Sequence, residues 1–124
     1  MLCDNSSVFM QVADIIEQTQ AKVLTLSSDQ SQFLIDKAFS SDLMSDVLTI
    51  DTENLMLITG LNNLQTIRTA EMAEVRCILF ARNKRPDKEM IALAENENIV
   101  LLISEKSVFH LSGLLFSAGL KPVF

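Results

Sequence analysis

Three short apolar runs recur at a regular interval in the second half of the chain. They are "LMLIT" (55–59), "CILFA" (77–81) and "VLLIS" (100–104), and they begin about 22 residues apart. Almost no polar residue alternates with the apolar ones, which is typical of strands covered on both faces in a parallel sheet. The pattern therefore predicts three buried, parallel strands.

Each apolar run is followed by a loop and then by a segment with helical spacing of apolar residues. The predicted helices are "NLQTIRTAEMAEV" (63–75), "PDKEMIALAENEN" (86–98) and "VFHLSGLLFSAGL" (108–120). Pro86 suits a first helical turn, and Gly119 is placed to end the last helix. Right-handed crossovers would bring the loops "TGLNN", "RNKR" and "SEKS" to one carboxyl edge of the sheet, where α/β proteins bind ligands.

The first half of the chain predicts a helix over 8–19. The buried face of this helix is assigned to Phe9, Val12, Ala13 and Ile16. Its N-cap is assigned to Ser6 or Ser7. The segments "KVLTL" (22–26) and "FLIDKAF" (33–39) predict two strands joined by a polar loop.

A short helix is expected in "SSDLMSDVL" (40–48). Its cap is Ser40 or Ser41, and its inward residues are Leu43, Met44 and Val47. The fold class that follows is α/β: one domain over residues 1–124, with a mixed sheet, parallel C-terminal strands and helices packed on it in a three-layer-like arrangement.

Size and composition agree with a single domain, because 124 residues with 48% apolar residues can bury a real core. No apolar run approaches the roughly 18–20 residues that cross a bilayer, and "MLCDNSSVF" lacks the features of a signal peptide. We therefore expect a cytoplasmic protein without a membrane partner. Cys3 and Cys77 are interpreted as free thiols.

Charge is unevenly distributed. The chain has a net charge of −6, with nine acids and two bases in residues 1–60 but seven acids and eight bases in residues 61–124. The main basic cluster is Arg82, Lys84, Arg85 and Lys88 in "RNKRPDK". This balance argues against a nucleic-acid partner and permits a local anion site.

With these elements in place, residues from about 10 to 120 resemble the DRTGG domain family. The match is carried by "SDLMSDVL" (41–48), which resembles the family's Asp-Leu-Leu-Ser-Asp-Val segment, and by "LMLITG", "RPDKEMIALA" and "NIVLLIS" with their spacing. The resemblance implies a bacterial-type regulatory module of the kind found beside CBS-domain pyrophosphatases, phosphotransacetylases and the kinase of the HPr phosphocarrier protein. We expect a stand-alone, single-domain member of unknown function.

One departure from the family concerns the loop after the second repeated strand. Where the family commonly has glycine, this chain has Arg82-Asn83-Lys84. Asparagine can adopt the left-handed conformation, but a glycine-lined approach to phosphate is lost. An anion here would be met by side-chain charge.

The loop "TGLNN" has two interpretations: a turn with a helix cap at Asn62 or Asn63, or a ligand contact. Neither the dinucleotide fingerprint nor a P-loop is present. Similarly, the basic loop is either a solvated surface or an anion clamp. The candidate ligand-binding residues are Thr59, Gly60, Asn62, Asn63, Arg82, Asn83 and Lys84.

Other polar residues offer little chemistry. Asp42 and Asp46 are interpreted as capping and surface groups, no cluster predicts a metal, and with Ser45 they form a candidate interaction surface. His110, the only histidine, is interpreted as a packing or surface residue. No catalytic residue and no cofactor is predicted, so we expect a protein that is not an enzyme.

The last predicted helix is apolar on more than one face, which requires burial inside the domain or against a partner. An identical copy is the most economical partner. The sequence thus predicts a non-catalytic regulatory or protein-interaction module that forms a homodimer and contacts a further, unidentified protein. The alternative is a sensor domain for a small phosphorylated or nucleotide anion at the carboxyl edge.

Overall fold

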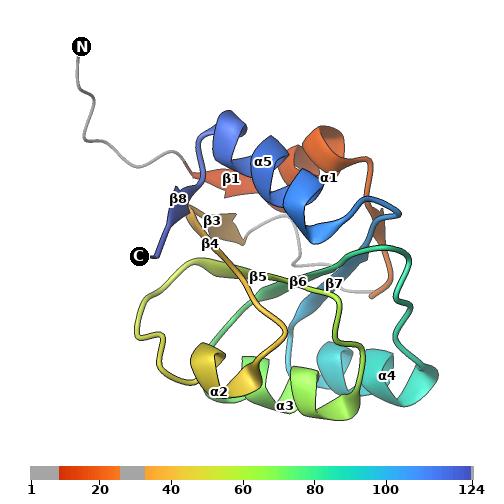
Figure 1. Ribbon diagram of the computed structural model, residues 1–124. Coiled ribbons are helices and arrows are strands. Elements are labelled where there is room, and N and C mark those ends of the chain that lie inside the picture. Colours follow the sequence, from red (N-terminus) through yellow and green to blue (C-terminus); the bar gives the residue numbers. More distant parts are fainter. Residues whose placement is uncertain (1–8, 26–32, 124) are drawn as a thin grey trace.

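The structure is a computed structural model, and it describes residues 9–25 and 33–123. Within these residues, six strands form one central sheet (Figure 1). Across the sheet the order is β2 (Lys22–Val23), β7 (Val100–Ile103), β6 (Cys77–Phe80), β5 (Leu55–Thr59), β4 (Lys37–Ser40) and β8 (Lys121–Pro122). All neighbours pair in parallel except β2, which is antiparallel to β7. The sheet is mixed and its C-terminal strands are parallel, as predicted.

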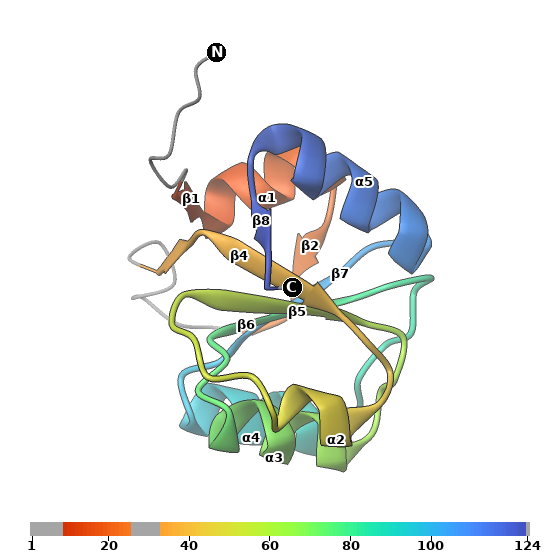
Figure 2. The ribbon, with the colours of Figure 1, turned by 60° about the vertical axis from the view of Figure 1, so that its left-hand side comes forward.

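Helices cover both faces of this sheet. Figures 1 and 2 show α1 and α5 on one face and α2, α3 and α4 on the other. Their bounds are α1 (Val12–Thr19), α2 (Met44–Val47), α3 (Leu64–Met72), α4 (Lys88–Asn96) and α5 (Val108–Ala118). The predicted three-layer arrangement is confirmed.

The apolar runs explain why two layers of helices are needed. In β5, Met56 and Ile58 join the buried cluster beneath α1 and α5, whereas Leu55 and Leu57 join the cluster beneath α2, α3 and α4. Successive strand side chains point to opposite faces, so a run without polar residues must be covered twice. Each such side chain contributes about 1.5–3 kcal/mol when fully buried.

The helices of the repeat begin at side-chain caps. Asn63 caps α3, where its Oδ1 accepts the Thr66 N–H at 3.1 Å, and Ser107 caps α5 in the same way. Asp87 caps α4, so Pro86 lies two residues before the helix and not in its first turn. The carboxylate supplies an acceptor for the helix that proline lacks, which explains why the prediction for Pro86 is wrong.

Gly119 ends α5 with φ of 116°, as predicted. This left-handed backbone is the region that glycine adopts without strain.

The first helix differs from its prediction because the chain before it is a strand. β1 (Met10–Gln11) pairs antiparallel with β3 (Leu34–Ile35), so α1 begins only at Val12. The buried residues of α1 are Val12, Ile15 and Thr19, whereas Phe9 is 49% exposed and Ala13 is exposed. Ser6 and Ser7, expected as caps, lie outside the described residues.

The predicted strand "FLIDKAF" is in fact two strands. It divides at Asp36 into β3 of the small antiparallel pair and β4 of the central sheet. Of the predicted strand over 22–26, β2 includes only Lys22–Val23, and residue 26 lies outside the described part of the chain.

The short helix α2 lies where the sequence predicts a helix, but the prediction that Leu43 is buried is wrong. Met44 and Val47 are buried, whereas Leu43 precedes the helix and is 58% exposed. Ser41 does not cap α2: its Oγ accepts the Leu43 N–H at 3.0 Å, which turns the chain before the helix begins. Across the described residues, no helix combines the length and hydropathy that a membrane crossing needs.

Candidate functional site

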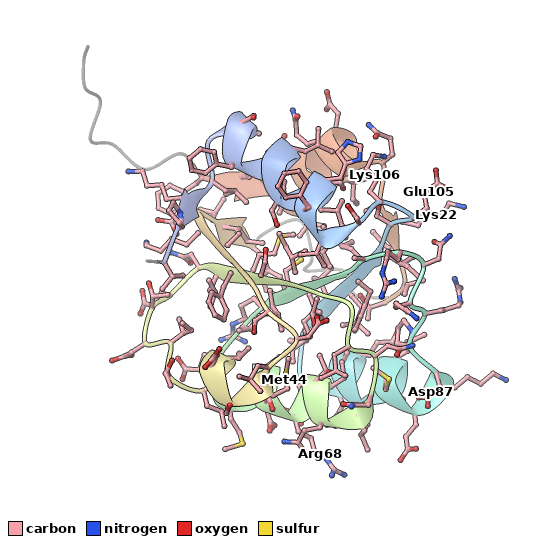
Figure 3. All side chains as sticks on the ribbon, viewed as in Figure 1. Lys22, Met44, Arg68, Asp87, Glu105 and Lys106 are labelled. Carbon is pink, nitrogen blue, oxygen red and sulfur yellow. The ribbon has the colours of Figure 1, made fainter. Side chains whose placement is uncertain are left out.

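The loops that follow β5, β6 and β7 meet at the carboxyl edge of the sheet, which we call the rim. The rim comprises residues 60–63, 81–87 and 104–107. The Arg82 N–H donates to the Lys106 carbonyl at 2.9 Å, which joins the second loop to the third. In Figure 3, Asp87 and Lys106 mark these two loops on the same side of the molecule. Parallel pairing thus brings together the three loops that the sequence assigns to one edge.

The loop after β6 is a tight turn with two left-handed residues. Arg82 and Asn83 each have φ of 54°, and the Lys84 N–H donates to the Ala81 carbonyl at 3.0 Å. Positive φ at both central residues is the arrangement of a type I′ turn. Asn83 adopts the conformation predicted for it, and Arg82 shares it at a cost of about 1–2 kcal/mol. The side chains of Arg82, Asn83 and Lys84 are all exposed.

Gly60 lies in the bend after β5, but its φ is not positive, so the position does not use the conformational freedom of glycine. A methyl group there would lie 3.7 Å from Asp42 Oδ2 and 3.8 Å from Arg82 Nη2, which are ordinary contact distances. The Arg82 guanidinium and the Asp42 carboxylate therefore both reach the space above Gly60.

The two asparagines of "TGLNN" have separate roles. Asn63 caps α3, so its side-chain oxygen already accepts from that helix. The Asn62 Nδ2 donates to the Arg85 carbonyl at 2.9 Å and ties the loop after β5 to the loop after β6. The basic loop and the opening of α3 are thus in direct contact.

Asp42 holds the centre of this arrangement. Its Oδ1 accepts the Thr59 hydroxyl and the Gly60 N–H, each at 2.8 Å. The Thr59 side chain is buried, and its oxygen also accepts the Leu61 N–H at 3.1 Å. Because β4 pairs in parallel with β5, the segment after β4 reaches the loop after β5. The sequence interpretation of Asp42 as a cap or surface group missed this contact.

The basic side chains near the rim differ in whether they are exposed to solvent or hydrogen-bonded within the chain. Arg82, Lys84, Arg85 and Lys88 are exposed. Lys106 instead donates to the Thr19 carbonyl at 3.1 Å and to Gln20 Oε1 at 2.8 Å, where its charge meets the C-terminal end of α1. The positive charge at the rim therefore comes from the loop after β6.

The remaining interaction candidates lie on α2. Ser45 and Asp46 are exposed there, and the Asp46 backbone carbonyl accepts the Thr49 hydroxyl at 2.6 Å. Their side chains face solvent within the described structure, and their role in binding a partner stays a prediction.

A second site candidate is a mostly apolar groove of about 400 Å³ between α5 and the strands β4 and β8, which we call the α5 groove. Phe109 is 90% exposed and Phe116 is 67% exposed, while Leu111 and Leu115 of the same helix are buried. The prediction that α5 is apolar on more than one face is confirmed. The groove is lined by Ala38, Phe39, Ser40, Ile58, Phe109, Ser112, Gly113, Leu115, Phe116, Leu120, Lys121, Pro122 and Val123.

Among the described residues, the thiol and the imidazole lie in different surroundings, one buried and the other exposed. Cys77 is a free, fully buried thiol, and burial raises its pKa from 9.0 to about 12, which disfavours the reactive thiolate. His110 is exposed on α5. In the described part of the chain, no three His, Cys, Asp or Glu side chains gather as a metal site requires. Cys3 lies outside the described residues.

Comparison with known proteins gives a likeness of structure. No protein-family model matches the sequence, and no curated protein sequence matches it. A similar solved structure is the crystal structure of the CBS and DRTGG domains of the regulatory region of Clostridium perfringens pyrophosphatase, complexed with its activator, diadenosine tetraphosphate. The TM-score is 0.74 at 16% sequence identity.

The matched region covers 88% of this chain and 47% of the pyrophosphatase chain, so the present chain corresponds to about half of that regulatory region. At this identity the likeness concerns the fold. It agrees with the resemblance carried by "SDLMSDVL" and the three apolar runs. The fold of this chain is therefore that of a DRTGG-like domain.

Proposed function

We propose that this chain is a non-catalytic regulatory module that assembles as a homodimer through the α5 groove. The observation that carries the proposal is the exposure of Phe109 and Phe116 beside that groove. Exposed apolar surface of this kind, next to a concave apolar site, marks an interaction surface. The regulatory role is supported by the likeness to a pyrophosphatase regulatory region.

A two-fold axis would let each copy insert an aromatic ring into the groove of the other. Phe109 and Phe116 are seven residues apart, so they lie on the same face of α5, and a Cβ added at Gly113 between them would meet nothing within 4 Å. This open space allows a partner to approach the helix closely. Burial of one phenylalanine ring contributes about 1.5–3 kcal/mol, and the symmetry doubles each contact.

The test compares Phe116→Glu with Ser117→Glu, an exposed neighbour that does not line the groove. Light scattering after gel filtration should give twice the 13.8 kDa mass of one chain for the wild type and for Ser117→Glu. Phe116→Glu should give a single-chain mass with an unchanged circular dichroism spectrum. A wild-type protein that stays at 13.8 kDa at every concentration would refute the dimer.

A second candidate function is favoured by the rim. We propose that the rim binds a small phosphorylated or nucleotide anion. The supporting observations are the Thr59 hydroxyl and the Gly60 N–H, which both donate to one carboxylate, and the nearby loop after β6, which carries Arg82 beside Gly60 and the exposed Lys84. Paired N–H and O–H donors with a guanidinium suit a phosphate group. The solved neighbour is itself complexed with a nucleotide activator.

The anion site is tested by thermal unfolding with diadenosine tetraphosphate and with inorganic tripolyphosphate. At 100 times Kd a ligand stabilises the fold by about 2.7 kcal/mol. The double variant Arg82→Ala/Lys84→Ala should lose this stabilisation. Arg68→Ala/Arg76→Ala removes the same charge from α3 and from the opposite end of β6, and it should keep the stabilisation. Equal loss in both variants would show non-specific electrostatics.

A protein partner other than a second copy would meet the exposed Ser45 and Asp46 of α2, next to Asp42. Under the proposal, catalysis belongs to such a partner and not to Cys77, His110 or Asp46. We therefore expect that His110→Ala leaves the catalytic turnover of a recovered partner protein unchanged.

A further inference from the structure

We propose that Asp42 is an internal competitor for the rim: its carboxylate occupies the donors that an incoming phosphate would use, and ligand binding releases it together with α2. This inference rests on the proposed anion site. It adds a regulatory link from the rim to Ser45 and Asp46, the exposed residues of α2. The partner proposed for these residues is a different protein, whereas the partner proposed for the α5 groove is a second copy of the chain.

The donors at the rim have the chemistry of a phosphate site. The buried Thr59 hydroxyl and the Gly60 N–H converge on one oxygen of Asp42, each at 2.8 Å. A phosphate oxygen accepts from the same two kinds of donor at the same distances. The site is thus already filled by an anion, and that anion belongs to the protein.

A cation lies beside these donors. A Cβ added at Gly60 would lie 3.8 Å from the Arg82 Nη2 and 3.7–3.8 Å from the two carboxylate oxygens of Asp42. The turn that carries Arg82 is fixed by backbone hydrogen bonds to the loop residues that it faces, Ser104 and Lys106, at 2.8 and 2.9 Å. Arg82 therefore stays at the rim when Asp42 leaves, and it would meet the incoming anion.

The segment that Asp42 anchors is weak by itself. α2 is a four-residue helix, and a helix of this length is not stable in isolation. It is held by the buried side chains of Met44 and Val47, while Leu43 and Leu48 on either side are 58% and 48% exposed. Loss of the Asp42 contact would remove the side-chain tie to the end of β5 and leave the backbone hydrogen bond from the Ser41 N–H to the Ile58 carbonyl, at 3.1 Å. We therefore expect α2 to shift about Ser41.

The expected effect follows from competition. When the binding-competent state is only a fraction of the population, the apparent affinity falls by that fraction. If Asp42 closes the rim about nine-tenths of the time, its removal should tighten binding on the order of tenfold. A residue that merely stabilised the rim would have the opposite effect, because its loss would weaken binding.

The experiment is isothermal titration of tripolyphosphate, and separately of diadenosine tetraphosphate, into wild type, Asp42→Ala, Asp42→Asn and Asp46→Asn. Asp42→Ala removes the competing group, whereas Asp42→Asn keeps an oxygen that can accept both hydrogen bonds and removes only the charge. Asp46→Asn changes the net charge equally from an exposed position four residues away and is the matched control. We expect about tenfold tighter binding in Asp42→Ala, a smaller gain in Asp42→Asn and none in Asp46→Asn.

A second readout follows the contact itself. The chain has only three glycines, so ¹⁵N-glycine labelling gives three amide signals, and the Gly60 signal is the one lost in Gly60→Ala. In the wild type, tripolyphosphate should move the Gly60 signal as the carboxylate is replaced. The chain has no tryptophan, so Leu43→Trp gives a single emission signal that should change on the same titration.

The outcomes separate the two proposals. If wild type and Asp42→Ala bind the probes with equal affinity, or if Asp42→Ala binds more weakly, the competitor role is wrong while the anion site stands. If no variant binds either probe, the anion site and the competitor role are both wrong. If Asp42→Ala and Asp46→Asn both bind the probes more tightly, and by the same factor, the change in net charge explains the effect and the competitor role is wrong.

Discussion

The Cys77 thiol shows how strongly a single buried residue responds to its surroundings. It is the first residue of β6, it is fully buried, and burial raises its pKa from 9.0 to about 12. Above pH 9 the unfolded chain releases this proton while the folded chain keeps it. The unfolded state then binds fewer protons, so the free energy of unfolding must fall as the pH rises.

This residue gives a pH prediction. In a Cys3→Ser background, the free energy of unfolding should fall by up to about 1.4 kcal/mol per pH unit between pH 9 and about 12 through Cys77 alone. Cys77→Ala should be less stable at neutral pH but should lose this part of the slope. Because the chain has no tyrosine, urea unfolding at several pH values isolates the thiol from phenol titration. Parallel pH profiles for the two proteins would contradict the prediction.

At the rim, residues with local partners were predictable and the residue with a distant partner was not. Asn63 caps α3 by accepting the N–H of Thr66, three residues further along the chain, a pattern that sequence alone indicates. Asp42 instead contacts Thr59 and Gly60, which are 17 and 18 residues away. That contact depends on the parallel register of β4 against β5, in which Ser40 pairs with Ile58. Because β5 is apolar and buried on both faces, its pattern does not distinguish one register from the next.

At the scale of elements, the strand–loop–helix repeat follows from local pattern, whereas the first half of the chain follows from pairing. The repeat has β5, β6 and β7 where the apolar runs lie and α3, α4 and α5 after them. By contrast, α1 begins late because Met10–Gln11 pairs with β3, and "FLIDKAF" divides because its two halves join different sheets. Non-local pairing overrides helical spacing there, since backbone N–H groups take the partners that the sheet offers.

In α5 and at its end, two glycine-to-alanine substitutions should change the free energy of unfolding in opposite directions. Gly113 lies in the helix interior and nothing would meet an added Cβ, whereas Gly119 has φ of 116°. Gly113→Ala should raise the free energy of unfolding by about 0.5–1 kcal/mol, because alanine favours the helix. Gly119→Ala should lower it by about 1 kcal/mol or more, because alanine is strained in the left-handed region.

Urea unfolding of both variants in the Phe116→Glu background checks these values without a contribution from dimer formation. A destabilised Gly113→Ala in that background would mean that the helix needs glycine at this position within one chain. Destabilisation only in the background that retains Phe116 would instead indicate a close approach of the second copy.

At the scale of the whole molecule, helices close the two faces of the sheet, and the proposed binding sites lie on the rim, the α5 groove and the exposed side of α2. The rim carries the basic loop of an otherwise acidic chain, and the α5 groove carries Phe109 and Phe116, the most exposed aromatic residues in the described part of the chain. The layers and the rim could be predicted because uninterrupted apolar strands require parallel pairing and cover on both faces. The groove could not, because its shape depends on how α5 lies against β8 and against β4, a strand that is distant from α5 in the sequence.

Assembly of two copies at the α5 groove is the central claim. A sample that mixes ¹³C,¹⁵N-labelled and unlabelled chains, studied by isotope-filtered nuclear Overhauser spectroscopy, tests it most directly. We predict intermolecular contacts between the Phe109 or Phe116 ring protons of one copy and the Leu120 or Val123 methyl groups of the other. A concentrated sample with no intermolecular contacts, or with contacts confined to α3 and α4, would contradict it.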